Sequence, residues 1–246
     1  MKKILLIVLF FIAVKSEAQE TYFPQALIEL YSSEGCENCP AADAFMKEIL
    51  HIADTFGQPV YVLDFHVDIW NRSGWVDPFS DSVNSKRQFF EALSVGQRAI
   101  FTPMVFVNGQ GGIPGAAKKE VGAYLNTMLR KQRYHNLATN AMLIQGKSIL
   151  GIDYTIDGNI DSVEIHFALV KKTVSSNVTA GDNKGKTLVH HNVVKVFKSQ
   201  VVKQKAGHFD LPVPDPNINL TDYGLVTFLQ KQNGGNVYAV DELLFR

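Results

Sequence analysis

The stretch Tyr31-Ser32-Ser33-Glu34-Gly35-Cys36-Glu37-Asn38-Cys39-Pro40 holds both cysteines of the chain, at the spacing C-x-x-C. Residues 26–31 before it form a short apolar run typical of a buried strand. After it, Pro40 suits a first helical turn, and apolar residues recur at helical spacing until Gly57. Thiols on a first helical turn lie where unpaired backbone N–H groups and the helix dipole stabilise a thiolate. The stretch therefore predicts either a redox dithiol or a local disulfide bridge between a strand and a helix.

The residues that follow continue the alternation of strands and helices. Residues 60–68 form a second apolar run, which predicts a buried strand parallel to the first. Residues 82–93 predict a helix with Ser82 as its cap and an apolar face that includes Val83, Phe89, Phe90 and Leu93. Residues 100–109 then predict a proline loop, a strand and an Asn-Gly hairpin turn. A short edge element is expected at 111–115 and a helix at 116–132.

Beyond about residue 136 the apolar period changes from helical to two. Short strands are expected at 141–145, 148–156, 161–170, 187–197, 199–205, 208–213, 224–231 and 237–245, with an exposed loop at 175–185. Such a series without a helix is typical of an antiparallel sandwich. The sequence therefore predicts an α/β domain over residues 20–135, a mixed sheet with flanking helices, followed by an all-β antiparallel sandwich domain over residues 136–246.

The first 19 residues have the pattern of a secretory signal peptide. Lys2 and Lys3 precede an apolar run over 4–14, and Ser16-Glu17-Ala18 resembles a small-x-small cleavage site. The apolar run is shorter than the roughly 20 residues that a membrane-spanning helix needs. We therefore expect export to the periplasm or the cell exterior, with no transmembrane segment in the mature chain.

The bulk composition excludes several classes of partner. The chain of 246 residues is 46% hydrophobic and 20% charged, and its formal net charge is +0. No block of like charges is present to attract nucleic acid or an anionic membrane. The strand-rich half has no nucleophile elbow, phosphate loop or carboxylate cluster, so no cofactor is predicted.

A resemblance to a known fold rests on two separated motifs. The C-x-x-C at a helix start and the later Thr102-Pro103, which leads into the strand Met104-Val105-Phe106-Val107, resemble the thioredoxin-like fold over roughly residues 25–133. More narrowly, the stretch from Ser33 to Pro40, with Phe65-His66-Val67-Asp68-x-Trp70 and Gly74-Trp75-x-Asp77-Pro78, is similar to an exported bacterial family of thioredoxin-like proteins catalogued as a domain of unknown function.

The thioredoxin-like resemblance implies roles for four residues. Cys36 is the attacking thiol and Cys39 the resolving thiol, while Pro103 matches a cis-proline beside the dithiol, where it and Thr102 align a substrate chain. The sequence departs from thioredoxin itself, which has Trp before the first cysteine and Gly-Pro between the two. Here Gly35 precedes Cys36, and Glu37 disfavours a nearby thiolate, so the reduction potential does not follow from the resemblance.

Several other residues near these motifs have two interpretations. His66 and Asp68 are candidates for a proton shuttle beside the dithiol; alternatively His66 is a hydrogen-bonded core residue and Asp68 caps the following loop. Asp64 and Asp68 are expected to share one face of the second strand. Trp70 and Trp75 form either an apolar wall for a peptide substrate or the packing of their own loop.

Metal binding is not predicted for this chain. Two thiolates with His66 fall short of the four ligands of a structural zinc site. His190 and His191 are adjacent on a strand and point to opposite faces, so they do not chelate one ion together.

These observations predict an exported thiol-disulfide oxidoreductase that acts on the thiols and disulfides of exported proteins or peptides, through Cys36 and Cys39. The alternative is a non-enzymatic exported binding or envelope-associated protein in which the C-x-x-C is a structural disulfide. The sequence does not indicate the oligomeric state.

Overall fold

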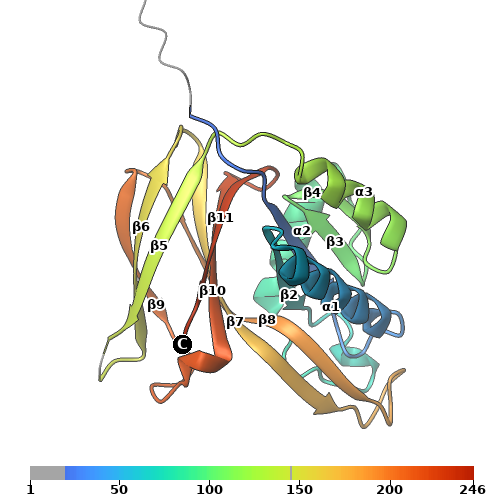
Figure 1. Cartoon of the computed structure of the whole chain (residues 1–246). Coiled ribbons are helices and arrows are strands. Elements are labelled where there is room, and N and C mark those ends of the chain that lie inside the picture. The colour runs from blue at the N-terminus through green and yellow to red at the C-terminus, as the bar shows by residue number, and fades with distance from the viewer. Residues whose placement is uncertain (1–19, 145) are drawn as a thin grey trace, which may run out of the picture.

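The strand that precedes the cysteines lies inside a mixed sheet (Figure 1). The computed structural model describes residues 20–144 and 146–246, so the predicted signal peptide lies outside the described residues. All seven residues of β1 (Ala26–Ser32) are buried. β1 is parallel to β2 (Val60–His66) and antiparallel to β3 (Met104–Val107). The predicted parallel pairing of the first two strands is confirmed.

A tight turn continues this sheet to its edge. Asn108 and Gly109 both have positive φ and connect β3 to the antiparallel β4 (Gln110–Pro114). A Cβ at Gly109 would lie 1.7 Å from the carbonyl oxygen of Gly235, so only glycine fits there. The predicted Asn-Gly turn is confirmed.

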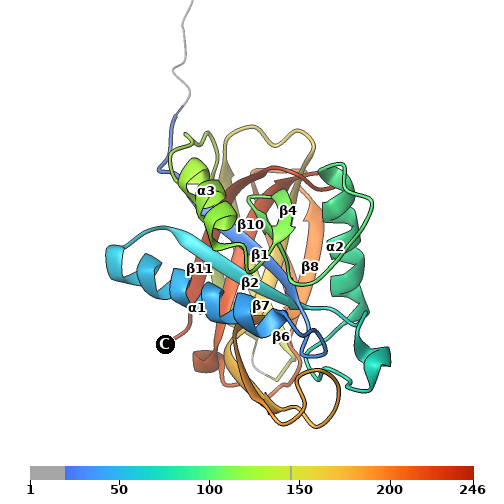
Figure 2. The ribbon, with the colours of Figure 1, turned by 90° about the vertical axis from the view of Figure 1, so that its right-hand side faces the viewer.

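Helices cover both faces of these four strands. α1 (Cys39–Phe56) and α3 (Lys118–Met128) share one apolar core with the sheet, and α2 (Ser82–Ser94) packs on the opposite face (Figure 2). α1 ends at Gly57, whose φ of 59° is left-handed, as the sequence pattern indicates. A short 3₁₀ turn (Asn71–Ser73) lies in the loop between β2 and α2.

The predicted bounds of α2 are close, but its predicted cap and apolar face are wrong. Asp81, not Ser82, is the cap, and its side chain accepts a hydrogen bond from the Val83 amide at 2.8 Å. The predicted face, Val83, Phe89, Phe90 and Leu93, is exposed. The buried residues are instead Asn84, Gln88, Glu91 and Ala92, because polar groups on the neighbouring segments hydrogen-bond to the first three.

The second half of the chain contributes strands to two sheets. A separate antiparallel sheet has the order β5-β6-β9, from β5 (Asn136–Leu143), β6 (Ile149–Asp157) and β9 (Ala206–Pro212). The remaining four strands join the first sheet: β7 (Val163–Asn177), β8 (Thr187–Val201), β10 (Tyr223–Lys231) and β11 (Val237–Leu244). The order of that sheet is β11-β10-β7-β8-β2-β1-β3-β4. The link is a parallel bridge between Asp64 of β2 and Val193 of β8. A 3₁₀ turn (Leu220–Asp222) precedes β10.

Strands β7, β10 and β11 are covered on both faces. On β10, Leu225 and Leu229 pack against the β5-β6-β9 sheet, whereas Val226 and Phe228 pack into the core that contains β1, β2 and β3. Alternate residues of one strand thus serve two cores. The sheet and one of its cores therefore cross the boundary predicted at residue 136.

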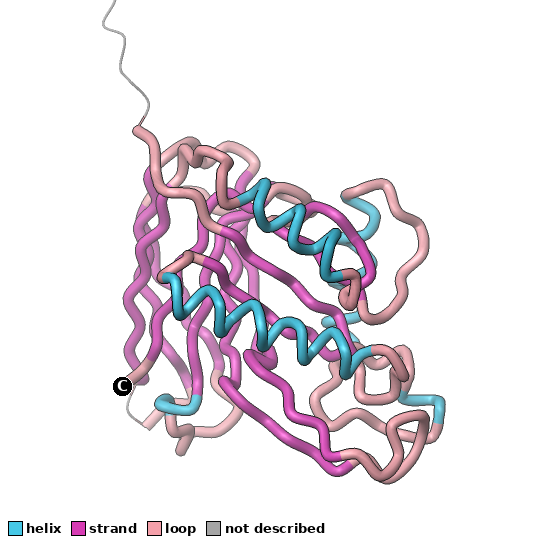
Figure 3. The backbone as a smooth tube through the Cα atoms, turned by 45° about the vertical axis from the view of Figure 1, so that its right-hand side comes forward, coloured by secondary structure: helices cyan, strands magenta, loops and turns pink. Residues whose placement is uncertain are grey.

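The hairpin of β7 and β8 is longer than the sequence pattern predicts. β7 continues to Asn177, so the expected loop at 175–185 is reduced to residues 178–186, and the two strands expected at 187–197 and 199–205 are largely one strand. Figure 3 shows this hairpin extending beyond the rest of the sheet toward the loops at which α1 begins. Its length brings residues of the second half to the cysteines.

The described residues therefore form an α/β protein with a mixed, helix-flanked sheet and a second, antiparallel sheet. Among these residues, no helix has the length and apolar character needed to cross a membrane.

Candidate functional site

The two cysteines are joined in a disulfide at the start of α1. Cys39 is the first residue of the helix, Pro40 lies in its first turn, and Cys36 lies in the loop after β1. The relative exposure of Cys36 is 2% and that of Cys39 is 1%. The predicted placement between a strand and a helix is confirmed, and the sulfur atoms are covered by neighbouring segments.

Trp70 connects the loop between β1 and α1 (residues 33–38, the cysteine loop) to Thr102 and Pro103. Its indole Nε1 donates a hydrogen bond to Oγ1 of Thr102 at 2.6 Å. A Cβ at Gly35 would lie 2.9 Å from Cβ of Trp70, so the absence of a side chain permits this close approach. The Thr102-Pro103 peptide bond is cis, as the resemblance implies. Gly35, which precedes Cys36, and Thr102, which precedes Pro103, therefore both lie beside Trp70.

Trp75 makes a second connection to the cysteine loop. Its Nε1 donates to Oε2 of Glu34 at 2.9 Å, and the Glu34 amide donates to Oδ2 of Asp77 at 2.8 Å. Both indoles therefore hold the loop between β2 and α2 (residues 67–81, the aromatic loop) against the rest of the protein, in agreement with the packing interpretation. Contact between these indoles and a substrate stays a prediction.

The β7–β8 hairpin covers the cysteine loop from the other side. Nδ2 of Asn183 donates to the carbonyl oxygens of Glu34 at 2.8 Å and Cys36 at 2.9 Å. The Glu34 carboxylate accepts hydrogen bonds from Ser176 and from Nε2 of His190, the latter at 3.0 Å. Asn183 and Glu34 are fully buried. Local sequence patterns do not reveal these contacts, because the residues are distant along the chain and residues 175–185 predict only an exposed loop.

Two buried histidines lie behind this loop, each between carboxylates. His190 approaches Asp43 through Nδ1 at 2.9 Å, in addition to Glu34. His66 approaches Asp77 through Nδ1 at 2.7 Å and Asp64 through Nε2 at 3.2 Å. The two imidazole rings are nearly perpendicular, with centroids 4.5 Å apart. The histidines and the four carboxylates form one buried polar cluster.

The carboxylates favour the charged form of both imidazoles. Burial opposes that charge, but Asp64 and Asp77 raise the pKa of His66 well above its ordinary value. Burial is likewise outweighed at His190, where Asp43 and Glu34 raise the pKa to about 9. Burial also opposes the charge of Glu34 and Asp77, but hydrogen bonds to their carboxylates lower the pKa of both residues. Burial raises the pKa of Asp43.

The proposed shuttle residues His66 and Asp68 lie in different hydrogen-bond networks. β2 ends at His66, so the expectation that Asp64 and Asp68 share a face of one strand is wrong. The Asp68 side chain accepts a hydrogen bond from Ser85 of α2. Asp64 is instead the carboxylate that meets His66, because residues two apart on a strand point to the same face.

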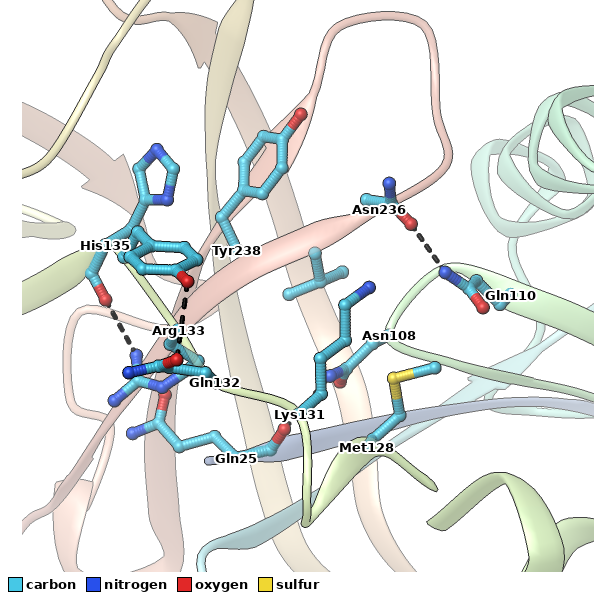
Figure 4. Close-up of a pocket in the computed structure, with 12 residues that line it drawn as sticks. Gln25, Asn108, Gln110, Met128, Lys131, Gln132, Arg133, His135, Asn236 and Tyr238 are labelled. Atoms are coloured by element: carbon cyan, nitrogen blue, oxygen red, sulfur yellow. Dashed lines mark hydrogen bonds between the residues drawn. The ribbon is translucent and has the colours of Figure 1, made fainter. Parts of the chain in front are cut away.

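A hollow of about 220 Å³ lies at a different place, beside the end of α3 and the β10–β11 turn (Figure 4). Five of its twelve lining residues have amide side chains, and several of these bond to other groups of the protein. Gln110, for example, donates to Asn236 at 2.6 Å. The predicted site residues are not among its lining residues, so the cysteine loop and its neighbours remain the candidate site.

Comparisons with known proteins identify the family and similar folds. The family model described as "Protein of unknown function (DUF1223)" matches residues 27–230. The crystal structure of protein AGR_C_4864 from Agrobacterium tumefaciens has a TM-score of 0.70 at 21% identity, covering 92% of this chain and 96% of that one. HBP35 of Porphyromonas gingivalis has a TM-score of 0.63 at 11% identity, covering 91% of this chain and 76% of that one. No curated protein matches the sequence.

Proposed function

This chain belongs to the DUF1223 family, and we propose that it is an exported thiol-disulfide oxidoreductase that acts through Cys36 and Cys39 on disulfides of exported proteins. The observation that carries the proposal is the location of the disulfide, which joins the first residue of α1 to the loop before it. The positive end of α1 favours a thiolate in this pair once the bridge is reduced, at Cys39 as the first helical residue and at Cys36 from the loop three residues before it.

The order of the elements supports the finer description of the fold. β1, C-x-x-C, α1, β2, α2, β3, β4 and α3 follow one another as expected for a thioredoxin-like domain. The two antiparallel groups of strands that pack across one core support a β-sandwich in the second half.

The proposed reaction is a two-step exchange. In the reduced protein, the Cys36 thiolate attacks one sulfur of a substrate disulfide, which forms a mixed disulfide and releases the other substrate sulfur as a thiolate. Cys39 then loses its proton and attacks Cys36 of the mixed disulfide. The intramolecular bridge forms, and the second substrate sulfur leaves as a thiolate. The substrate gains two electrons and the dithiol loses two; the reverse sequence oxidises a substrate.

Thr102 and Pro103 are proposed to position the substrate chain. Trp70 holds Thr102 close to the cysteine loop through the 2.6 Å hydrogen bond. The substrate backbone is therefore expected to approach at the start of β3.

One observation favours the second candidate, a binding protein with a permanent bridge. The 2% exposure of Cys36 means that no substrate reaches its sulfur atom until the hairpin or the aromatic loop moves. A bridge that never opens needs no such movement.

The redox equilibrium of the pair against glutathione separates the two candidates. An oxidoreductase is expected at about −120 to −270 mV, the range of thioredoxin-like enzymes. A potential below about −300 mV is that of a structural bridge and would favour the binding protein.

A further inference from the structure

Asp64, His66 and His190 meet where the two halves of the chain join. Asp64 and His66 lie on β2, His190 lies on β8, and the bridge between these strands is at Asp64 and Val193. One ligand atom from each side chain lies within 4.8 Å of the other two. Their side-chain exposures are 3%, 0% and 1%, respectively. Two imidazole nitrogens and a carboxylate oxygen thus converge away from solvent.

Carboxylates beyond this triad hold the imidazoles in place. Asp77 fixes the orientation of His66 through Nδ1, so that Nε2 of His66 points to Asp64. His190 has Asp43 at one ring nitrogen and Glu34 at the other, so one carboxylate orients the ring whichever nitrogen acts as ligand. A carboxylate on the second nitrogen is the usual support of a metal-bound histidine.

The charges of the cluster provide a second, independent observation. Four carboxyl groups surround two imidazoles, so acidic groups outnumber basic groups in the cluster. Asp43 also has a buried Oδ1 with no hydrogen-bond partner in the described part of the chain. Such an atom is costly to bury. A cation at the cluster would balance the excess of acidic groups and lower the cost of burying this oxygen.

We propose that Asp64, His66 and His190 form a binding site for one divalent transition-metal ion of the zinc class. Imidazole nitrogen with a carboxylate oxygen suits Zn²⁺, Co²⁺ and Cu²⁺, whereas Mg²⁺ and Ca²⁺ prefer oxygen alone. Each ligating imidazole binds as the neutral base, so a ring that is protonated beforehand releases one proton on binding.

The proposed site uses neither cysteine, so it differs from a thiolate site in one measurable way. Binding must occur in the oxidised protein, whose sulfur atoms are joined to each other. The proposal is therefore independent of whether the dithiol exchanges with substrates.

The test is a titration of the oxidised, full-length protein, prepared without a histidine tag and dialysed against EDTA. Zn²⁺ is added in competition with a chromogenic chelator, and Co²⁺ is followed by its visible absorption. We expect one ion per chain, no competition from millimolar Mg²⁺, and a loss of affinity of at least about 100-fold in His66→Gln and His190→Gln. Asp77→Asn is expected to lose about 10 to 100-fold, as for other outer partners of metal-bound histidines.

His208 supplies a matched control on the protein surface. It lies between Asp153 at 2.7 Å and Asp210 at 3.0 Å, but 53% of its side chain is exposed. His208→Gln is expected to leave stoichiometry and affinity unchanged. Far-ultraviolet circular dichroism of the metal-free variants establishes that they are folded.

Three results would overturn the proposal. The first is an affinity unchanged in both His66→Gln and His190→Gln, and the second is binding that appears only after the disulfide is reduced. The third uses the wild-type protein alone and holds even if the variants do not fold: the oxidised protein takes no Zn²⁺ from the chelator.

Discussion

Asn183 donates a 2.9 Å hydrogen bond to the carbonyl oxygen of Cys36, from a position 147 residues further along the chain. The same amide group donates to the carbonyl oxygen of Glu34 at 2.8 Å. The tip of the β7–β8 hairpin is thus fastened to the backbone of the cysteine loop. Access to the disulfide therefore depends on a segment outside the α/β region that carries the cysteines.

Removing this fastening should expose the disulfide. Asn183→Ala deletes both hydrogen bonds and leaves the buried carbonyl oxygen of Glu34 unpaired among the described residues, while that of Cys36 keeps the Cys39 amide at 3.3 Å. The lost partner costs about 1 to 3 kcal/mol of local stability. We expect faster reduction of the Cys36–Cys39 bridge by dithiothreitol, measured by alkylation of the released thiols. Asn177→Ala is the control, because Asn177 is an exposed residue of the same hairpin whose side chain accepts a hydrogen bond from Thr187 across it. Equal reduction rates in the two variants would show that the hairpin does not limit access.

Gly35 should not tolerate a side chain. The Cβ of Gly35→Ala would lie 2.9 Å from Cβ of Trp70, so the aromatic loop must shift. Overpacking of this kind costs roughly 1 to 3 kcal/mol, measurable by urea unfolding. Gly122→Ala is the matched control: a Cβ there meets nothing within 4 Å. Because Gly122 lies inside α3, this change should stabilise the protein by about 0.5 to 1 kcal/mol. A Gly35→Ala protein as stable as the wild type would contradict the close approach.

Glu91 should make stability depend on pH. Burial and the neighbouring Glu29 raise its pKa to about 7, against the opposing charge of Arg87. As pH rises from about 4.5 to 7, the unfolded chain releases this proton while the folded protein retains it, so stability falls; above 7 it levels off. The decline attributable to Glu91 is up to about 3 kcal/mol.

Comparison with Glu91→Gln isolates this contribution. The variant has no proton to release at this position, so its free energy of unfolding should fall less than that of the wild type between pH 5 and 8. Glu37→Gln, at an exposed residue, should keep the wild-type decline. Parallel curves for the wild type and Glu91→Gln would refute the prediction.

The local pattern of residues was sufficient for the elements around the cysteines. The apolar run before Cys36, the helical spacing after Pro40 and the Asn108-Gly109 turn correctly placed β1, α1 and the β3–β4 turn, because each element follows from its own residues. The pattern failed at α2, where buried side chains such as Gln88 are polar and depend on partners elsewhere in the chain.

The same reason explains what was missed at the site. Asn183, Ser176 and His190 reach the cysteine loop only because β7 and β8 form a long hairpin, and neither strand length nor pairing is visible in a period of two. The adjacent His190 and His191 point to opposite faces of their strand, so their spacing indicates no shared site. His190 instead meets His66 across two strands, a contact that no local spacing reveals.

The most direct test of the proposed function is covalent trapping by Cys39→Ala in the cells that produce the protein. This variant keeps Cys36 but cannot resolve a mixed disulfide, so adducts with exported proteins should accumulate and disappear on reduction. The double variant Cys36→Ala with Cys39→Ala is the control and should form none. Recovery of exported proteins bound to Cys36 is the predicted result; a free Cys36 thiol in a folded Cys39→Ala protein, with no adducts, would contradict the account.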